Sequence, residues 1–319
     1  FFLMLRRPPG STLFPYPTLC RSAVADFRFD QAAGMRRLLG GGQQLQVVTF
    51  VAGCEGVGRS VAVANIGVAM ARLGKEVLII DEHAPGDDIA TAFGLAARGD
   101  LLNVVQRETP LSQVLLQPMR GLRVLPAARA VKKLGRLSLH QQQTLLDAMS
   151  GLERPVDVIL VDASMAHPHG FSPFGVAAQE AVVVLSGSSA SITEAYSLIK
   201  KVSHAFARKH FRILVNKVRS QPDARSIYEN IAQVAAQRGI ARLDYAGAIP
   251  LDESLRQAVQ MGRSVLLQAP DSPSAAAFRD IASDMLYWQR SDSEAAGVEQ
   301  FMQQLLHLSQ RITPQALRA

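Results

Sequence analysis

The chain has 319 residues, of which 48% are hydrophobic and 19% charged, and its formal net charge is +7. This composition supports a sizeable buried core and excludes an intrinsically disordered chain, and no apolar run reaches the roughly 18 residues that a transmembrane helix needs. Two cysteines, Cys20 and Cys54, exclude a disulfide framework or a thiolate zinc site and fit a reducing, cytoplasmic setting.

The first 24 residues do not resemble the rest of the chain. They begin without Met, are rich in Pro and aromatic residues, and include STLFPYPTLCRS, which resembles translated sequencing-adapter read-through. The apolar start is too short for a signal peptide. We therefore interpret residues 1–24 as a non-native leader and leave them out of the fold prediction.

Residues 25–44 are predicted to be a partner-binding segment with a linker. Residues 27–40 read FRFDQAAGMRRLLG, which is typical of a short helix or of a segment that folds on binding, and Gly40–Gly42 follow it. Residues 1–40 hold six Arg against two Asp, so most of the net charge lies here and only +3 remains for the other residues. That modest excess argues against nucleic-acid binding by the body of the protein.

From Gln46 to about residue 290, short apolar runs alternate with longer amphipathic stretches. This alternation predicts an α/β fold, a mainly parallel twisted sheet with helices on both faces. The expected strands are 46–52, 76–81, 122–127, 157–162, 181–186, 211–216 and 245–250. The expected helices are 59–73, 139–152, 191–206, 222–239 and 274–288.

A glycine-rich loop between the first strand and the first helix carries the strongest functional signal. Residues 53–60 read GCEGVGRS, close to the phosphate-binding P-loop pattern G-x-x-x-x-G-K-[ST]. Its backbone N–H groups and the helix N-terminus would face phosphate oxygens. The expected nucleotide contacts are Gly53, Glu55, Gly56, Val57, Gly58, Arg59 and Ser60.

Asp162 ends the strand DVILVD about a hundred residues after this loop. A carboxylate at that place and the hydroxyl of Ser60 are what a P-loop protein uses to hold Mg²⁺. A lone Asp at a strand end is often only a loop cap, so the P-loop upstream gives this prediction its weight.

The loop and the strand pattern resemble the MinD/ParA family of P-loop ATPases over residues 45–290. Within that family the chain is similar to the flagellar-number regulators (FlhG, also called FleN). Three stretches carry this likeness: DQAAGMR at 30–36, SITEAYSLIK at 191–200, and VNKV at 215–218 with GAIPLD at 247–252. The resemblance implies that Asn216 reads adenine, that Pro250 and Asp252 lie beside the nucleoside, and that the cofactors are ATP and Mg²⁺.

The P-loop departs from the family pattern KGGxGK[ST] at three positions. The signature Lys, which in the family reaches the phosphates of a partner subunit, is Cys54 here. The following Gly is Glu55, an anion, and the second Lys is Arg59, a planar fork in place of a compact ammonium. Cys54 also allows a redox switch, although a small filler residue is the simpler interpretation.

The second strand ends with a further departure. The family reads DxDxGxxN, and the ungapped match places Asp81 on the metal side, His83 at the Asp that activates water, and Asp88 at the Asn. The resemblance thus gives Arg59, His83 and Asp81 as catalytic residues and Ser60, Asp81 and Asp162 as metal ligands. We expect slow or absent hydrolysis, because a water-orienting carboxylate is lost, unless His83, or the neighbouring Glu82, Asp87 or Asp88, replaces it.

Residues 291–319 are predicted to contain an amphipathic helix. Its apolar stripe fits either a membrane surface, as in MinD-like tails, or packing on the body of the protein, and few basic residues accompany it. Two minor predictions complete the chain. His167-Pro168-His169 is interpreted as a polar loop in preference to a metal pair, and Trp288 as a packing residue.

The resemblance favours a nucleotide-dependent switch that limits flagellar assembly, in the cytoplasm or at the inner face of the cell membrane. The implied partners are an FlhF-like signal-recognition-type GTPase, flagellar C-ring proteins, a flagellar transcription activator, and a second copy of the chain on ATP binding. A ParA-type partitioning ATPase that binds DNA, and a pseudo-ATPase that acts only as a scaffold, are the alternatives.

Overall fold

A computed structural model describes residues 45–86, 88–288 and 297–316. The expected leader (1–24), the expected partner-binding segment (25–44) and Asp87 lie outside the described residues. The described residues all fall within one of the two units into which the chain divides, Gln43–Ala319.

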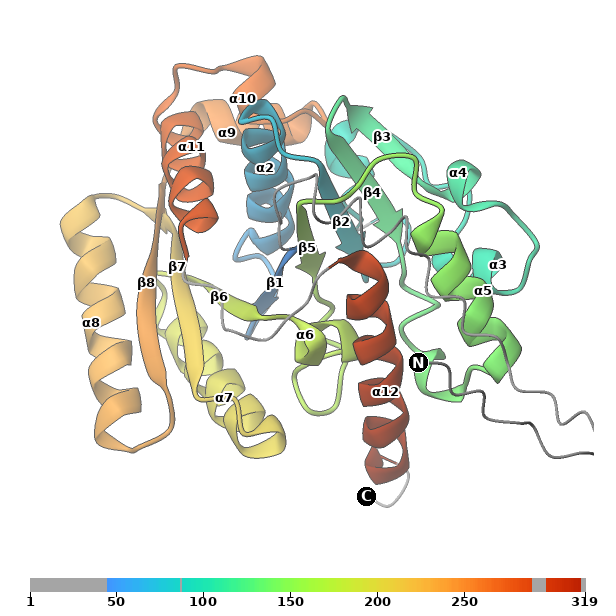
Figure 1. Ribbon diagram of the computed structural model, residues 1–319. Coiled ribbons are helices and arrows are strands. Elements are labelled where there is room, and N and C mark those ends of the chain that lie inside the picture. The colour runs from blue at the N-terminus through green and yellow to red at the C-terminus, as the bar shows by residue number, and fades with distance from the viewer. Residues whose placement is uncertain (1–44, 87, 289–296, 317–319) are drawn as a thin grey trace, which may run out of the picture. The chain divides into compact units, whose positions relative to one another are not determined.

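The described residues form one eight-stranded sheet, which runs through the centre of Figure 1. All seven expected strands are present within a few residues, because near-continuous apolar runs are buried on both faces of a parallel sheet. In chain order the strands are β1 (Gln46–Ala52), β2 (Val77–Asp81), β3 (Leu116–Met119), β4 (Leu122–Pro126), β5 (Val158–Asp162), β6 (Glu180–Ser186), β7 (His210–Val218) and β8 (Arg242–Pro250).

The strand order in the sheet is β3-β4-β2-β5-β1-β6-β7-β8. Every pairing is parallel except that of β3 with β4. The sequence did not predict β3, an edge strand of four residues that contains a proline and is only partly buried. The order places β1 between β5 and β6, so the loop after β1 opens at the carboxyl edge beside Asp162.

Helices cover both faces of the sheet, as the alternating pattern predicts. The five helices expected before residue 290 are α2, α5, α7, α8 and α11, the helix expected in residues 291–319 is α12, and the others are mostly too short to show a helical period. The helices are α2 (Arg59–Arg72), α3 (Leu101–Val105), α4 (Leu111–Val114), α5 (Leu139–Ser150), α6 (Pro173–Ala177), α7 (Ser189–Phe206), α8 (Gln221–Gln237), α9 (Glu253–Gln260), α10 (Val265–Gln268), α11 (Pro273–Leu286) and α12 (Val298–Ala316), with 3₁₀ turns η1 (Thr91–Phe93) and η2 (Leu134–Arg136).

The core consists of two hydrophobic layers, one on each face of the sheet. Alternate side chains of each strand point into opposite layers. On β2, Leu78 and Ile80 belong to one layer, and Val77 and Ile79 belong to the other. Helices α5, α6, α7, α8 and α12 pack on the first layer, and α2, α9, α10 and α11 on the second.

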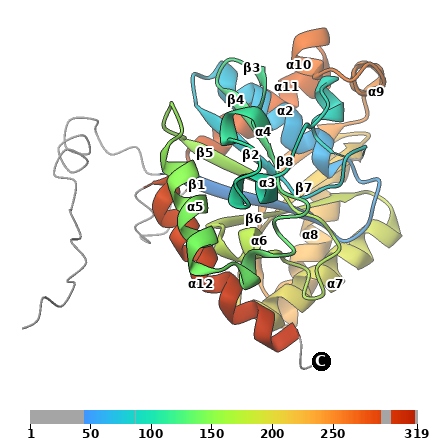
Figure 2. The same ribbon diagram turned by 90° about the vertical axis from the view of Figure 1, so that its right-hand side faces the viewer.

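The predicted amphipathic tail helix is α12, and the described side chains of its apolar stripe pack against the core. The helix lies against α5, α6 and η2 (Figures 1 and 2). Phe301, Met302 and Leu305 are at most 1% exposed. Of the two interpretations of the stripe, the structure therefore supports packing on the body, and membrane contact through this stripe would require the helix to detach. No helix among the described residues is long and apolar enough to cross a membrane.

Leu305→Ala should lower the free energy of unfolding by about 2–5 kcal/mol, because it opens a cavity under α12. Gln304→Ala changes an exposed neighbour on the same helix and should change stability by less than about 0.5 kcal/mol. Urea unfolding curves of the full chain measure both. Equal stability of the two variants would mean that α12 does not pack on the body in solution.

Candidate functional site

The loop after β1 has the backbone geometry of a phosphate-binding loop. Gly56 and Gly58 have φ angles of 72° and 82°, in the left-handed region where a side chain would be strained. A Cβ atom on Gly58 would also lie 2.4 Å from Nδ2 of Asn216. Gly58 is the residue before α2, so the helix N-terminus, with its unpaired N–H groups and positive dipole, faces the cavity beside the loop.

Gly53 has a different reason to be glycine. Its backbone approaches the first part of α7, and a Cβ atom there would lie 2.3 Å from the carbonyl carbon of Glu194 and 2.5 Å from the nitrogen of Ala195. The loop is thus held between β1 and α7. This contact links the loop to the stretch SITEAYSLIK, which forms part of α7.

Two cavities that share Gly56, Gly58 and Val61 lie along the loop. One, of about 670 Å³, is lined by the loop, His83 and the turn Ser164–Ala166. The other, of about 660 Å³, is lined by Asn216, Lys217 and the stretch 250–260. Cavities of this size suit a small ligand, and their arrangement fits phosphates in the first and a base in the second.

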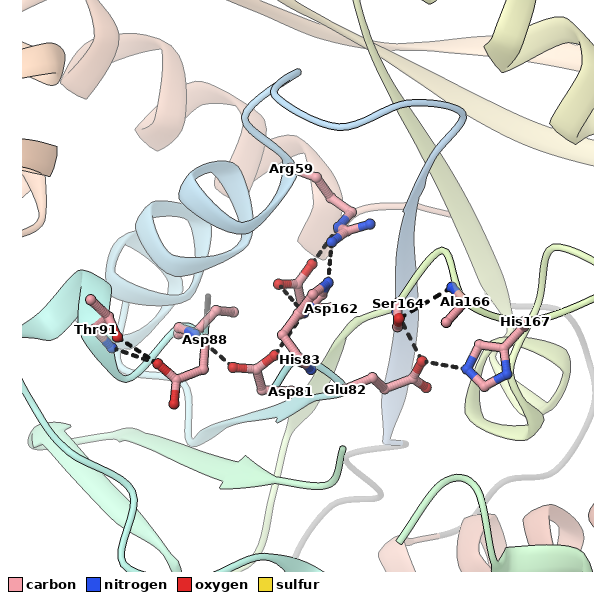
Figure 3. Close-up of polar contacts among 11 residues, drawn as sticks. Arg59, Asp81, Glu82, His83, Asp88, Thr91, Asp162, Ser164, Ala166 and His167 are labelled. Atoms are coloured by element: carbon pink, nitrogen blue, oxygen red, sulfur yellow. Dashed lines mark hydrogen bonds and ion pairs between the residues drawn. The ribbon is translucent and has the colours of Figure 1, made fainter. Parts of the chain in front are cut away.

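Asp162, Arg59 and His83 contact one another (Figure 3), and Arg59 and His83 line the first cavity. Arg59 Nε donates a hydrogen bond to Oδ1 of Asp162 over 2.6 Å, and Arg59 Nη2 contacts Nε2 of His83. Nδ1 of His83 lies 3.2 Å from Oδ2 of Asp162. The Asp162 side chain is completely buried, so its charge depends on these neighbours.

Asp81 completes the group from the adjacent strand, where it pairs in register with Asp162. Its Oδ1 accepts hydrogen bonds from N and Nδ1 of His83, at 3.0 and 2.9 Å, and its Oδ2 accepts one from N of Ile89 at 2.6 Å. The predicted site residues are therefore brought together by α2 (Arg59), β2 (Asp81), the loop after β2 (His83) and β5 (Asp162).

The group shifts the pKa values of its members in different directions. Burial raises the pKa of Asp162, but the Arg59 charge and the hydrogen bonds from His83 and Ser60 outweigh it, so the net pKa is lowered. Burial and the nearby charge of Asp162 raise the pKa of Asp81, against its hydrogen bonds. Burial lowers the pKa of His83, but hydrogen bonds to Asp162 and Asp81 raise it more, to about 9, against the Arg59 charge.

These carboxylates are the expected ligands of Mg²⁺, but the residues present do not fit that ion in this arrangement. One atom each of Asp81, His83 and Asp162 lie within 4.8 Å of one another, and Oδ2 of Asp162 is buried without a hydrogen bond. However, the His83 nitrogen near that oxygen, Nδ1, also faces Oδ1 of Asp81 and therefore carries a proton. A Mg²⁺ ion about 2.1 Å from Oδ2 would meet this N–H. The expected metal role of Ser60, Asp81 and Asp162 stays a prediction against which the geometry argues.

The other carboxylates that could have replaced the lost catalytic Asp are engaged elsewhere. Glu82 is buried, and its Oε2 accepts hydrogen bonds from N of Ser164 at 3.0 Å and pairs with Nε2 of His167 at 3.2 Å. Asp88 accepts hydrogen bonds from N and Oγ1 of Thr91. Figure 3 shows both away from the Arg59 contact. Of the described candidates, only His83 lines the first cavity.

In the second cavity, the side chain of Asn216 forms its hydrogen bonds with the loop and with Lys217. Its Nδ2 donates to the carbonyl of Val57 at 2.7 Å, and its Oδ1 accepts from N of Lys217. Lys217 has a φ of 58° and donates from Nζ to the carbonyl of Gly56 at 2.6 Å. The sequence analysis singled out Asn216 in VNKV and missed Lys217, although its position in that motif was the available signal.

Pro250 and Asp252, which are predicted to lie beside the nucleoside, line the same cavity. Asp252 also has a structural task, because it caps α9 through N of Ser254 and accepts hydrogen bonds from N and Oγ of Ser274. These bonds outweigh burial and lower its pKa. A nucleoside contact by Asp252 stays a prediction.

The other residues singled out in the sequence are described by their packing, exposure and polar contacts. Cys54 is half-buried and packs against the core layer under α2, which fits a filler residue, and Glu55 is exposed. His167 is the partner of Glu82 and His169 packs edge-on against Phe206, so they do not form a metal pair with each other. Trp288 packs beside the core, with Arg212 over its ring.

Fold and site together define a P-loop nucleotide-binding protein. A family model of the CobQ/CobB/MinD/ParA nucleotide-binding domain matches residues 48–265. The chain belongs to this family, and the predicted MinD/ParA resemblance is confirmed.

Characterised relatives agree with this assignment. The antiactivator FleN of Pseudomonas aeruginosa is 30% identical over 268 residues, which cover 84% of this chain and 96% of FleN. The septum site-determining protein MinD of Bacillus subtilis is 23% identical over 246 residues, 76% of this chain and 89% of that MinD.

Solved structures share the fold. In the MinC:MinD cell division protein complex of Aquifex aeolicus, the matching chain has a TM-score of 0.60 and 24% identity, and the match covers 77% of this chain and 97% of that one. MinD of Pyrococcus horikoshii, complexed with Mg-ADP, has a TM-score of 0.55 and 20% identity, and the match covers 80% of this chain and 98% of that one. The predicted fold class is confirmed.

Gly53→Ala should lower the free energy of unfolding by about 1–3 kcal/mol, because the added methyl group overlaps the backbone of α7. Gly187→Ala is the matched control. A Cβ atom there would meet only the tip of the Ile227 side chain, at 3.3 Å, and should cost less than about 1 kcal/mol. Urea unfolding measures both, and an unchanged Gly53→Ala variant would contradict the close approach of loop and helix.

Proposed function

We propose that this chain is a MinD-like nucleotide switch that binds ATP, hydrolyses it slowly or not at all, and regulates flagellar number or assembly. The similarity to the antiactivator FleN over most of both chains supports the flagellar role. The stretches at 30–36 and 191–200, which resemble flagellar-number regulators, support it as well; the first lies outside the described residues.

One observation carries the nucleotide-binding part of the proposal. The loop retains left-handed glycines and the helix N-terminus, and two cavities with shared lining residues lie along it. Ground-state binding relies on this backbone. The groups that would act in the transition state differ from those of the family pattern, because Cys54 replaces the Lys that reaches a partner subunit and His83 replaces a carboxylate. Turnover should therefore suffer more than affinity.

The proposed partners follow from the same resemblance. They are an FlhF-like signal-recognition-type GTPase, flagellar C-ring proteins, a flagellar transcription activator and a second copy of this chain. The chain would work in the cytoplasm, with contact to the inner face of the membrane through a partner or a detached α12. We assign GTPase contact to residues 30–37, where Arg36 and Arg37 could stabilise charge during phosphoryl transfer. A peptide of residues 27–40 that left GTP turnover of such a partner unchanged would remove this part.

Restoring the family residues should restore turnover. The combined variant Cys54→Lys, Glu55→Gly, Arg59→Lys, His83→Asp should hydrolyse ATP at least about 10-fold faster than the wild type at saturating ATP and Mg²⁺, since about 1.4 kcal/mol of transition-state stabilisation has that effect. Phosphate release by the full chain measures it. Arg238→Lys, at an exposed position on the turn after α8, is the control.

Two outcomes contradict the proposal in different ways. Wild-type turnover equal to that of the restored variant would show that His83 or a neighbour already performs the catalytic role. Absence of ATP binding at millimolar nucleotide would leave only the scaffold alternative.

A further inference from the structure

Each carboxylate oxygen of Asp81 and Asp162 already has a nitrogen atom of the protein within 3.2 Å. Oδ1 of Asp162 accepts from Arg59, and Oδ2 of Asp162 faces Nδ1 of His83. Both oxygens of Asp81 accept hydrogen bonds, one from His83 and the other from Ile89. A metal ion that used any of these oxygens would have to displace a donor that belongs to the protein.

Arg59 is the donor that matters most, because its charge is permanent at any relevant pH. Its contacts with Asp162 and His83 use Nε and Nη2. In Figure 3 one nitrogen of the guanidinium points away from the carboxylates. Arg59 also lines the cavity that the P-loop surrounds. A single planar group can therefore neutralise the buried carboxylate and offer N–H groups to a phosphate.

The hydrogen on Nδ1 of His83 is present whether or not the ring is charged. Nδ1 faces oxygens of both Asp81 and Asp162 and carries a hydrogen in the neutral and in the charged ring. This hydrogen lies between the two carboxylates, between which a shared metal ion would have to sit. Mg²⁺ requires near-octahedral oxygen ligands and loses its water reluctantly, so an N–H group there disfavours it.

We propose that this site binds a nucleoside triphosphate without a divalent metal, and that Arg59, seated on Asp162 and backed by His83, takes the place that Mg²⁺ holds in other P-loop proteins. The inference deepens the proposed function and rests on it. The competing arrangement is that nucleotide draws Arg59 away from Asp162 and that Mg²⁺ then takes its place. The two arrangements differ in one measurable respect, the dependence of nucleotide affinity on Mg²⁺.

The decisive experiment uses the unaltered full chain. ATP affinity is measured by isothermal titration calorimetry, once with excess Mg²⁺ and once with excess EDTA. We expect the dissociation constants to agree within about twofold. A loss of affinity of about tenfold or more in EDTA, equivalent to about 1.4 kcal/mol, would overturn the inference and leave the proposed function standing. No binding in either buffer would instead refute the proposed function and with it the inference.

A matched variant shows that the assay can detect metal dependence. Arg59→Lys combined with His83→Asp replaces the fork by a compact ammonium and the N–H donor by a carboxylate. This variant should bind ATP at least about tenfold more tightly with Mg²⁺ than with EDTA. Circular dichroism reports whether it folds. If it does not fold, the wild-type comparison still decides the question.

Binding of the metal alone gives a second, independent readout. The electron paramagnetic resonance signal of Mn²⁺ measures how much of the ion is free. We expect Mn²⁺ to remain free in the presence of the nucleotide-free wild type at the concentration that half saturates the folded double variant. Stoichiometric Mn²⁺ binding by the wild type that Asp162→Asn abolishes would overturn the inference.

Discussion

The ion pair between Arg59 and Asp162 is the constraint on which the rest of the site depends. Asp162 ends β5 with its side chain fully buried, and an ionised carboxylate in that position is costly unless charge-assisted hydrogen bonds satisfy it. Arg59 supplies the nearest one as the first residue of α2, directly after the glycine loop. The shape of the loop and the charge balance of the sheet edge therefore depend on one side chain.

The sheet makes this balance necessary. Asp81 and Asp162 lie in register on neighbouring parallel strands, so two carboxylates are forced together at the carboxyl edge. A third acid two residues after Asp81, as in the family pattern, would call for a metal ion. His83 occupies that position and donates to both carboxylates instead. The departures at positions 59 and 83 are thus physically related, because each lets the protein neutralise the acids with its own groups.

Much of the fold could be predicted from the sequence, and the site only in part. Buried β-branched runs indicated seven of the eight strands, whereas β3 gives no such pattern because it is short, partly exposed and contains a proline. The resemblance to the family placed Arg59, Asp81 and Asp162 in one site, and the structure brings them together at the carboxyl edge of the sheet. The sequence could not show that Arg59 turns toward Asp162, or that Lys217 donates to the loop, because these contacts depend on side-chain geometry between distant segments.

The geometry of arginine explains why these features occur together. Its fork reaches Asp162 with one nitrogen and His83 with another while a third remains for a phosphate, which a single ammonium group on lysine cannot match. A charge fixed on a buried carboxylate acts equally before and during phosphoryl transfer, so it supports binding and adds little to catalysis. A nucleotide held in this way would leave mainly by dissociation. The state of such a switch would then follow nucleotide concentration and partner binding, and hydrolysis would have little part in setting it.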